Sequence, residues 1–164
     1  MLVKDVMTKN PISVKPDMSV LEAKEIMNKN KINKLPVLDK NGSLVGIITR
    51  NDLVKASPSE ATTLDMFELG YLLSKLTVEK AMKKDVKTVQ ENETVENAAS
   101  LMRDYSVGSL VVLKDDLMVG IITETDLFEC FIEMFKTKTE GIRVTLILDE
   151  KPGQIAKLSA LIAE

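Results

Sequence analysis

The sequence contains no histidine and no tryptophan, and it has one cysteine among 164 residues. Without histidine the chain cannot carry a Ser-His-Asp or Cys-His catalytic group, an imidazole zinc site or a histidine-based pH switch. The single cysteine, Cys130, can form neither an intrachain disulfide nor a thiolate metal site. These absences exclude several common classes of enzyme and favour a protein that binds a ligand over one that catalyses a reaction.

The sequence also lacks a long apolar run and an excess of charge of one sign. No apolar stretch approaches the roughly 18 residues that span a bilayer, and the first residues, Met1–Asp5, do not resemble the apolar part of a signal peptide. Because 22 basic residues face 25 acidic ones, no electrostatic attraction to nucleic acid or to an anionic membrane is expected. At 45% hydrophobic residues the chain can bury a core. We therefore expect a folded, cytoplasmic protein without a nucleic-acid or membrane partner.

Two copies of one pattern run through the chain. Met7 and Met82 are 75 positions apart, and the same spacing relates a series of apolar residues. These pairs are Val14/Val89, Val20/Val95, Ala23/Ala98, Met27/Met102, Leu35/Leu110, Val37/Val112 and Leu38/Leu113. One residue is then lost in the second copy, after which Val45–Thr49 and Val119–Thr123 match letter for letter, 74 positions apart. The loss falls at residues 39–43, where a turn tolerates it best.

Each copy has the pattern of a strand, a helix, two strands and a second helix, which predicts an α/β fold with two related halves. In the first copy Ile12–Val14 is a short extended segment, and Ser19 with Glu22 forms a capping box before the first helix. Thr94 is the equivalent cap in the second copy. The second helices begin near Asn51 and near Thr125.

The two apolar strands in the middle of the first copy are separated by a turn signal. Leu35–Leu38 and Leu44–Ile48 are of strand length, and Asn41-Gly42 lies between them. This dipeptide is typical of a tight β-hairpin turn because both residues tolerate a positive φ. The pattern therefore predicts that these two strands pair antiparallel.

An amphipathic stretch follows each copy. The apolar residues of the first stretch are Leu64, Phe67, Leu72 and Leu76, and those of the second are Phe128, Phe131, Ile132 and Phe135. Such faces need cover. They either pack into the core of the same chain or form a seam between two copies in a dimer.

Each copy carries the motif Thr-x-x-Asp where a strand passes into a helix, as Thr49 with Asp52 and as Thr123 with Asp126. A carboxylate can accept hydrogen bonds from both hydroxyls of a ribose, and a helix N-terminus offers free N–H groups to a phosphate. The alternative is a capping box that holds the helix end without any ligand. The two roles can coexist.

The repeated Val-Gly-Ile-Ile-Thr-x-x-Asp-Leu resembles a tandem pair of CBS domains, also called a Bateman module. The resemblance implies two β-α-β-β-α repeats related by a pseudo-twofold axis, at residues 1–56 and 78–136, joined by a helical linker at 57–77. It implies that AMP, ADP, ATP or S-adenosylmethionine binds in clefts between the repeats, with no covalent cofactor. It further implies that the signal passes to an attached domain or partner, that the chain is not an enzyme, and that the helices form a homodimer.

In this family each cleft takes its Thr/Asp pair from one repeat and its adenine wall from the other. Carried over, the expected residues of site B are Thr123, Asp126, Ile12, Ser13, Asn33, Lys34 and Leu35. Those of site A are Thr49, Asp52, Arg50, Lys87, Thr88, Gly108, Ser109 and Leu110. Lys34 and Arg50 are candidates for phosphate binding, or else solvated surface cations. We expect both sites to bind a nucleotide, with different preferences for the number of phosphates.

The end of the chain has a pattern of its own. Gly141–Leu148 is a predicted strand, Pro152-Gly153 a turn and Gln154–Ala163 an amphipathic helix. Residues 140–164 resemble the first strand and helix of an ACT domain, a small ferredoxin-like regulatory fold. A lone strand and helix cannot bury both faces of a sheet, so this segment either begins a longer domain or packs on a neighbour, and we expect the former. CBS pairs followed by an ACT domain resemble acetoin-utilisation proteins.

Three functions are compatible with these residues. The first is a ligand-sensing regulatory module. The second is an enzyme acting on nucleotides, which is disfavoured because the sequence has no Walker motif, no histidine and no metal-binding cluster. The third is a structural dimerisation module with empty clefts, in which both Thr-x-x-Asp motifs are helix caps only.

Overall fold

The computed structural model describes residues 1–56, 71, 74–134 and 151–162. Met1–Met134 form one unit, which contains both repeats, and Phe135–Glu164 form another. In the latter, α8 (Gln154–Ile162) confirms the predicted helix. The predicted strand at 141–148 and most of the predicted linker at 57–77 lie outside the described residues. Within the described ranges, no helix combines the length and the apolar character needed to cross a membrane.

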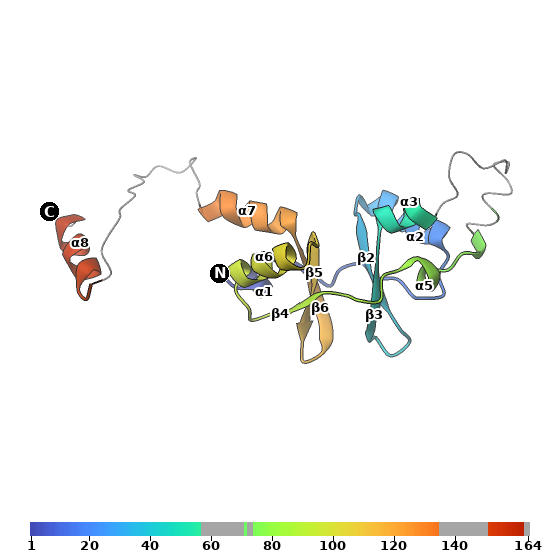
Figure 1. The fold of residues 1–164 in the computed structure, drawn as a ribbon, viewed down its shortest axis with the longest axis horizontal. Coiled ribbons are helices and arrows are strands. Elements are labelled where there is room, and N and C mark those ends of the chain that lie inside the picture. Colours follow the sequence, from blue (N-terminus) through green and yellow to red (C-terminus); the bar gives the residue numbers. More distant parts are fainter. Residues whose placement is uncertain (57–70, 72–73, 135–150, 163–164) are drawn as a thin grey trace. The chain divides into compact units, whose positions relative to one another are not determined.

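Repeat 2 has the predicted order of strand, helix, two strands and helix, and repeat 1 has the same order except that its first strand is reduced to a single bridging residue (Figure 1). Repeat 1 contains a one-residue bridge at Val14, then α2 (Val20–Asn30), β2 (Lys34–Leu38), β3 (Leu44–Thr49) and α3 (Arg50–Ala56). Repeat 2 contains β4 (Thr88–Gln90), α6 (Val95–Asp104), β5 (Ser109–Lys114), β6 (Leu117–Thr123) and α7 (Glu124–Met134). The α/β fold with two related halves is thus confirmed.

The predicted helix caps are present. The Ser19 hydroxyl accepts a hydrogen bond from the Glu22 N–H at 3.2 Å, and the Ser19 N–H donates to the Glu22 carboxylate at 3.0 Å. In repeat 2 the Thr94 hydroxyl accepts from the Asn97 N–H at 3.2 Å. These caps satisfy donors that a helix N-terminus otherwise leaves unpaired, so α2 and α6 begin where the sequence predicted.

The hairpins explain where the second copy is one residue shorter. In repeat 1 the turn between β2 and β3 runs through residues 39–43, with Gly42 at φ +81° and the Asp39 carboxylate accepting from the N–H groups of Asn41 and Ser43 at 2.8 Å. In repeat 2 the equivalent stretch is residues 114–117, one residue shorter; Lys114 and Leu117 belong to the strands, and Asp115 and Asp116 between them both have positive φ. Two such residues form the tight turn that matches strand twist.

The repeats exchange their first segments. Helix α1 (Val3–Val6) and strand β1 (Thr8–Lys9) are the first elements of repeat 1 in the sequence. In the structure, however, β1 pairs with β6 of repeat 2, with Thr8 opposite Ile121. Reciprocally, Lys83, which follows α5 (Val78–Ala81), bridges Ile47 of β3 in repeat 1. These two pairings are equivalent under the repeat spacing. The exchange therefore has the pseudo-twofold symmetry that the sequence repeat implied.

The exchange also builds the two hydrophobic cores. Val78 is fully buried among residues of repeat 1, and Val3 is fully buried among residues of repeat 2. At the two crossings, where an exchanged segment passes to the other repeat, a methionine lies against a glycine: Met82 against Gly46 and Met7 against Gly120. In both contacts a Cβ on the glycine would come within 3.0 Å of the methionine sulfur. Each core is therefore incomplete without a segment from the other repeat.

Three large apolar residues of α7 stay outside both cores, although Leu127 packs against the core of repeat 2 and Cys130 is buried. The side chains of Phe128, Phe131 and Ile132 are 67%, 58% and 65% exposed. Burial in the core of the same chain is thus the wrong explanation for these three residues. Phe135 and the apolar residues predicted at positions 64, 67 and 72 lie outside the described residues.

Candidate functional site

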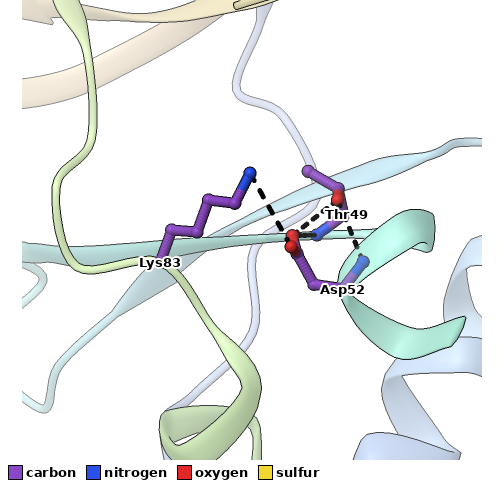
Figure 2. Close-up of polar contacts among 3 residues, drawn as sticks. All are labelled: Thr49, Asp52 and Lys83. Carbon is purple, nitrogen blue, oxygen red and sulfur yellow. Dashed lines mark hydrogen bonds and ion pairs between the residues drawn. The ribbon is translucent and has the colours of Figure 1, made fainter. Parts of the chain in front are cut away.

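The first Thr-x-x-Asp motif forms a reciprocal cap where β3 passes into α3 (Figure 2). One carboxylate oxygen of Asp52, Oδ2, accepts from the Thr49 N–H at 2.9 Å and from the Thr49 hydroxyl at 2.5 Å. The Thr49 hydroxyl in turn accepts from the Asp52 N–H at 3.3 Å. The capping role considered for the motif is thus present, and it uses only one oxygen of the carboxylate.

The second motif repeats this geometry where β6 passes into α7. Asp126 Oδ2 accepts from the Thr123 N–H at 2.7 Å and from the Thr123 hydroxyl at 2.8 Å, and the hydroxyl accepts from the Asp126 N–H at 3.4 Å. In both motifs the Oδ1 atom takes no part in the cap. A hydrogen-bonding position therefore remains on each aspartate.

The two remaining oxygens have different surroundings. Asp52 is 7% exposed, and its Oδ1 lies 3.7 Å from the ammonium of Lys83 (Figure 2). For Asp126, which is half-buried, no lysine or arginine among the described residues lies within 4.0 Å of the carboxylate. The residue equivalent to Lys83 is Thr8. The ion pair is therefore specific to the first motif.

A cleft of about 580 Å³, here called cleft A, opens beside the first motif. The residues that line it are Asn33, Lys34, Ile47, Thr49, Arg50, Asn51, Asp52, Lys55, Lys83, Asp85, Val86, Lys87, Ser106, Val107, Gly108 and Ser109. Six of the residues expected at site A are among them, whereas Thr88 and Leu110 are not.

A second cleft of about 530 Å³, here called cleft B, opens beside the second motif. The residues that line it are Thr8, Asn10, Pro11, Ile12, Ile32, Asn33, Lys34, Gly108, Ile121, Thr123, Glu124 and Thr125. Four of the residues expected at site B are among them. Ser13, Leu35 and Asp126 do not line this cleft, although Asp126 caps Thr123, which does.

Two expected wall residues belong to the cores instead. Leu35 and Leu110 are fully buried, one in each hydrophobic core. Successive side chains of a strand point to opposite faces, and each leucine directly follows a residue that lines the clefts, Lys34 or Ser109. The side chains of these two leucines therefore belong to the cores, and the expectation that the two residues form part of the ligand sites stays a prediction.

The clefts are built from equivalent positions. Every residue that lines cleft B corresponds, under the repeat spacing, to a residue that lines cleft A. Sequence reasoning missed the residues that enter with the exchanged segments, namely Thr8 and Asn10 in cleft B and Lys83 and Asp85 in cleft A. The spacing of Met7 and Met82 was the available signal, because these residues immediately follow the two methionines.

Lys34 lies at the border of the two clefts and lines both. Its ammonium donates a hydrogen bond to the carbonyl of Gly108, which also lines both. Burial lowers the pKa of Lys34 below its usual value, and the nearby carboxylates of Glu124 and Asp126 oppose this shift. Lys34 is therefore a partly buried cation with a fixed hydrogen-bond partner, and not a solvated surface cation.

Arg50 and Lys87 are also positioned by neighbours. Arg50 donates to the side-chain oxygens of Asn33 and Asn28, both at 2.9 Å. Lys87 donates to both carboxylate oxygens of Asp85 at 2.7 and 2.9 Å, and its ammonium lies 4.8 Å from the ring centre of Tyr105. Since only two of the five guanidinium N–H groups of Arg50 have these partners, the side chain can still donate into cleft A.

These features are shared with known proteins. The family model of the CBS domain matches residues 3–59 and residues 78–133. The chain therefore belongs to the CBS domain family, and it contains a tandem pair of these domains. The family is one of regulatory modules, and its match does not extend to residues 140–164. The resemblance of that segment to an ACT domain stays a prediction.

Relatives of the pair include parts of enzymes. The chain is 36% identical over 131 residues to an L-aspartate semialdehyde sulfurtransferase of Methanocaldococcus jannaschii. That match covers 79% of this chain and 23% of the sulfurtransferase. The chain thus spans less than a quarter of the length of that relative, so the likeness concerns the CBS pair alone.

Solved structures with this fold include complexes with adenosine ligands. The CBS domain pair of protein MJ0100, in complex with 5′-methylthioadenosine and S-adenosyl-L-methionine, has a TM-score of 0.68 and 35% identity, covering 82% of this chain and 98% of that one. CBSX2 in complex with AMP has a TM-score of 0.67 and 30% identity, with the same coverage. A putative acetoin utilization protein from Vibrio cholerae has a TM-score of 0.71 and 26% identity, covering 87% and 98%.

Proposed function

We propose that this chain is a regulatory module that binds adenosine-containing ligands in cleft A and cleft B. The observation that supports this most directly is the repeated cap, which holds a carboxylate at the mouth of a helix N-terminus and leaves one oxygen outside the cap. A motif that served only the helix would not need to lie beside a cleft in both repeats. The adenosine ligands of the MJ0100 pair and of CBSX2 support the same class of ligand.

The aspartates are proposed to hold the ribose. A ribose carries two adjacent hydroxyls, and Oδ1 of each aspartate has lone pairs that can accept from them. In cleft A this contact would form where Lys83 now lies, 3.7 Å from Asp52 Oδ1. Lys83 is 63% exposed, so it can move aside or bind the ligand itself.

The adenine ring is proposed to lie between apolar side chains at equivalent positions of the two clefts. In cleft A these are Ile47, Val86 and Val107, and in cleft B they are Ile121, Pro11 and Ile32. Aliphatic walls suit an aromatic base, because most of the binding surface of a small ligand is apolar. Ile12 enlarges the apolar wall of cleft B where cleft A has Lys87.

Regulation is proposed to follow from the way in which the clefts are assembled. Each cleft is lined by both repeats and by an exchanged segment, so a bound ligand would contact both repeats at once. The ligand shifts the arrangement of the repeats only by its difference in affinity for the two arrangements. An attached domain or a partner protein would read that shift.

Titration of Asp52→Asn and Asp126→Asn tests the ligand sites. Asparagine keeps an acceptor for the cap but removes the charge, so each variant should weaken the binding of AMP or 5′-methylthioadenosine in its own cleft by about tenfold. The circular dichroism spectrum should not change. If the wild-type chain binds no adenosine ligand at millimolar concentration, the pair is a structural module whose motifs are caps only.

The exposed face of α7 is proposed to pair with a second copy of the chain. Phe128, Phe131 and Ile132 lie on one side of the helix at spacings of three and four residues and stay more than half exposed. Phe131→Lys should shift the sedimentation of the chain from dimer to monomer. Leu117→Lys is the matched control, because Leu117 is 63% exposed in a hairpin rather than on this face. A wild-type chain that sediments as a monomer would contradict the dimer.

A further inference from the structure

The two clefts differ in charge at equivalent positions. Cleft A has Arg50, Lys83 and Lys87 where cleft B has Glu124, Thr8 and Ile12. With Lys34 and Lys55, cleft A is lined by five basic side chains against the two acidic residues Asp52 and Asp85. Cleft B is lined by one basic residue, Lys34, and one acidic residue, Glu124, and the carboxylate of Asp126 lies beside it on Thr123. The scaffold is thus the same, but the electrostatic environment is not.

The cations of cleft A are placed around the proposed ribose position. Lys83 lies beside Asp52 Oδ1, and Arg50 follows the capping residue Thr49 at the first position of α3. Lys87 approaches from the other repeat, held by Asp85. A chain of phosphates that extends from a ribose on Asp52 would therefore meet positive charge from both repeats and from the exchanged segment.

Cleft B has no excess of positive charge, because the one ammonium, that of Lys34, lies near the carboxylates of Glu124 and Asp126. The Lys34 ammonium is bonded to the Gly108 carbonyl. The Glu124 carboxylate lies over the same glycine, where a Cβ would be 2.8 Å from Glu124 Oε2 and 3.2 Å from Lys34 Nζ. Glu124 is the first residue of α7, where cleft A has Arg50. A phosphate at this helix start would therefore meet a carboxylate in place of a guanidinium.

We infer that the clefts divide adenosine ligands by the charge of the 5′ substituent. Cleft A takes nucleotides with a chain of phosphates, whereas cleft B takes adenosines whose 5′ group is uncharged or positive, such as a thioether or a sulfonium. The residue pair Arg50 and Glu124 sets this choice, because it places opposite charges at the same point of the two helices. This inference rests on the proposed function and specifies which ligand enters which cleft.

The test measures the binding of ATP and of 5′-methylthioadenosine by calorimetry in two variants. Each variant has a silenced cleft, that is, a cleft whose aspartate is replaced by asparagine. In Asp126→Asn, which leaves cleft A intact, ATP should bind at least about tenfold more tightly than 5′-methylthioadenosine, and in Asp52→Asn the order should be reversed. Raising the ionic strength should weaken ATP binding in cleft A and leave 5′-methylthioadenosine binding in cleft B almost unchanged.

A charge reversal then identifies the determinant. Glu124→Arg in the Asp52→Asn chain should raise the affinity for ATP by about tenfold. Glu129→Arg is the matched control, because Glu129 is exposed on the same helix, carries the same charge and lines neither cleft. Equal gains from both substitutions would overturn the role of Glu124.

The outcomes separate the inference from the proposed function. If both clefts bind adenosine ligands but prefer the same one, the division by charge is wrong, although the proposed function stands. If neither ATP nor 5′-methylthioadenosine binds the wild-type chain, the proposed function fails and the inference fails with it. The two silenced chains carry the test even if Glu124→Arg does not fold.

Discussion

Cleft A and cleft B are two versions of one arrangement that have kept their geometry and changed their charge. The hydrogen bonds from Thr49 and Thr123 to the aspartates differ by at most 0.3 Å between the repeats. At the next position one helix begins with Arg50 and the other with Glu124. Each cap is constrained by the start of the helix, whereas side chains that face solvent can change charge at little cost to stability.

The comparison also shows that the two repeats depend on each other. Val3 and Val78 are fully buried in the core of the opposite repeat, so neither core is complete in an isolated repeat. The same exchanged segments bring Thr8 into cleft B and Lys83 into cleft A. The charge difference therefore comes partly from the crossing that stabilises the fold.

The largest loss of stability is expected when a buried leucine is truncated at equivalent positions of the two cores. Leu35→Ala and Leu110→Ala should each lower the free energy of unfolding by about 2–5 kcal/mol, since both side chains are fully buried. Because the cores share exchanged segments, each variant should shift a single transition of both repeats in urea, followed by circular dichroism. The control Leu117→Ala removes an exposed side chain and should change little. Two separate transitions would show that the repeats unfold independently.

A smaller loss is expected at the two crossings. Gly46→Ala and Gly120→Ala should each cost about 1–3 kcal/mol, because the added methyl group meets a methionine sulfur and a backbone carbonyl. Met82→Ala should recover part of the loss in Gly46→Ala, and Met7→Ala part of the loss in Gly120→Ala. Urea denaturation of the single and double variants gives both coupling energies. Additive effects at one crossing alone would mean that the two contacts are not equivalent.

The smallest effect is expected at the caps. Thr49→Ala and Thr123→Ala should each lower the free energy of unfolding by about 1 kcal/mol, because each removes the hydroxyl that caps α3 or α7. Thr49→Ser and Thr123→Ser keep the hydroxyl and serve as controls. Thermal denaturation measures all four. A clear loss in one repeat and none in the other would contradict the equivalence of the caps.

The sequence predicted the helices and strands of both repeats, but it did not predict that the repeats exchange their first segments. The repeat spacing, the Ser19 and Thr94 caps and the Asn41-Gly42 turn placed the helices and strands, because each of these signals acts within a few residues. Periodicity does not tell which sheet an apolar segment covers, so the crossing of Val3–Met7 was not predicted.

For the candidate site too, the sequence predicted residues in local motifs and missed residues that the exchanged segments bring in. Thr49, Asp52 and Thr123 were found from a local motif and lie in or beside the clefts. The side chains along β2 alternate, so that Lys34 lines both clefts while the side chain of Leu35 lies in the core. Lys83 was missed because it reaches cleft A only through the exchanged segment, 31 positions from Asp52 in the sequence.

A competition titration on the wild-type chain tests the central claim most directly. ATP and 5′-methylthioadenosine are titrated separately, and each is then titrated against a chain saturated with the other. We expect one tight site for each ligand, and we expect a chain saturated with one ligand still to bind the other, because they occupy different clefts. Full displacement of one ligand by the other would contradict a division between cleft A and cleft B.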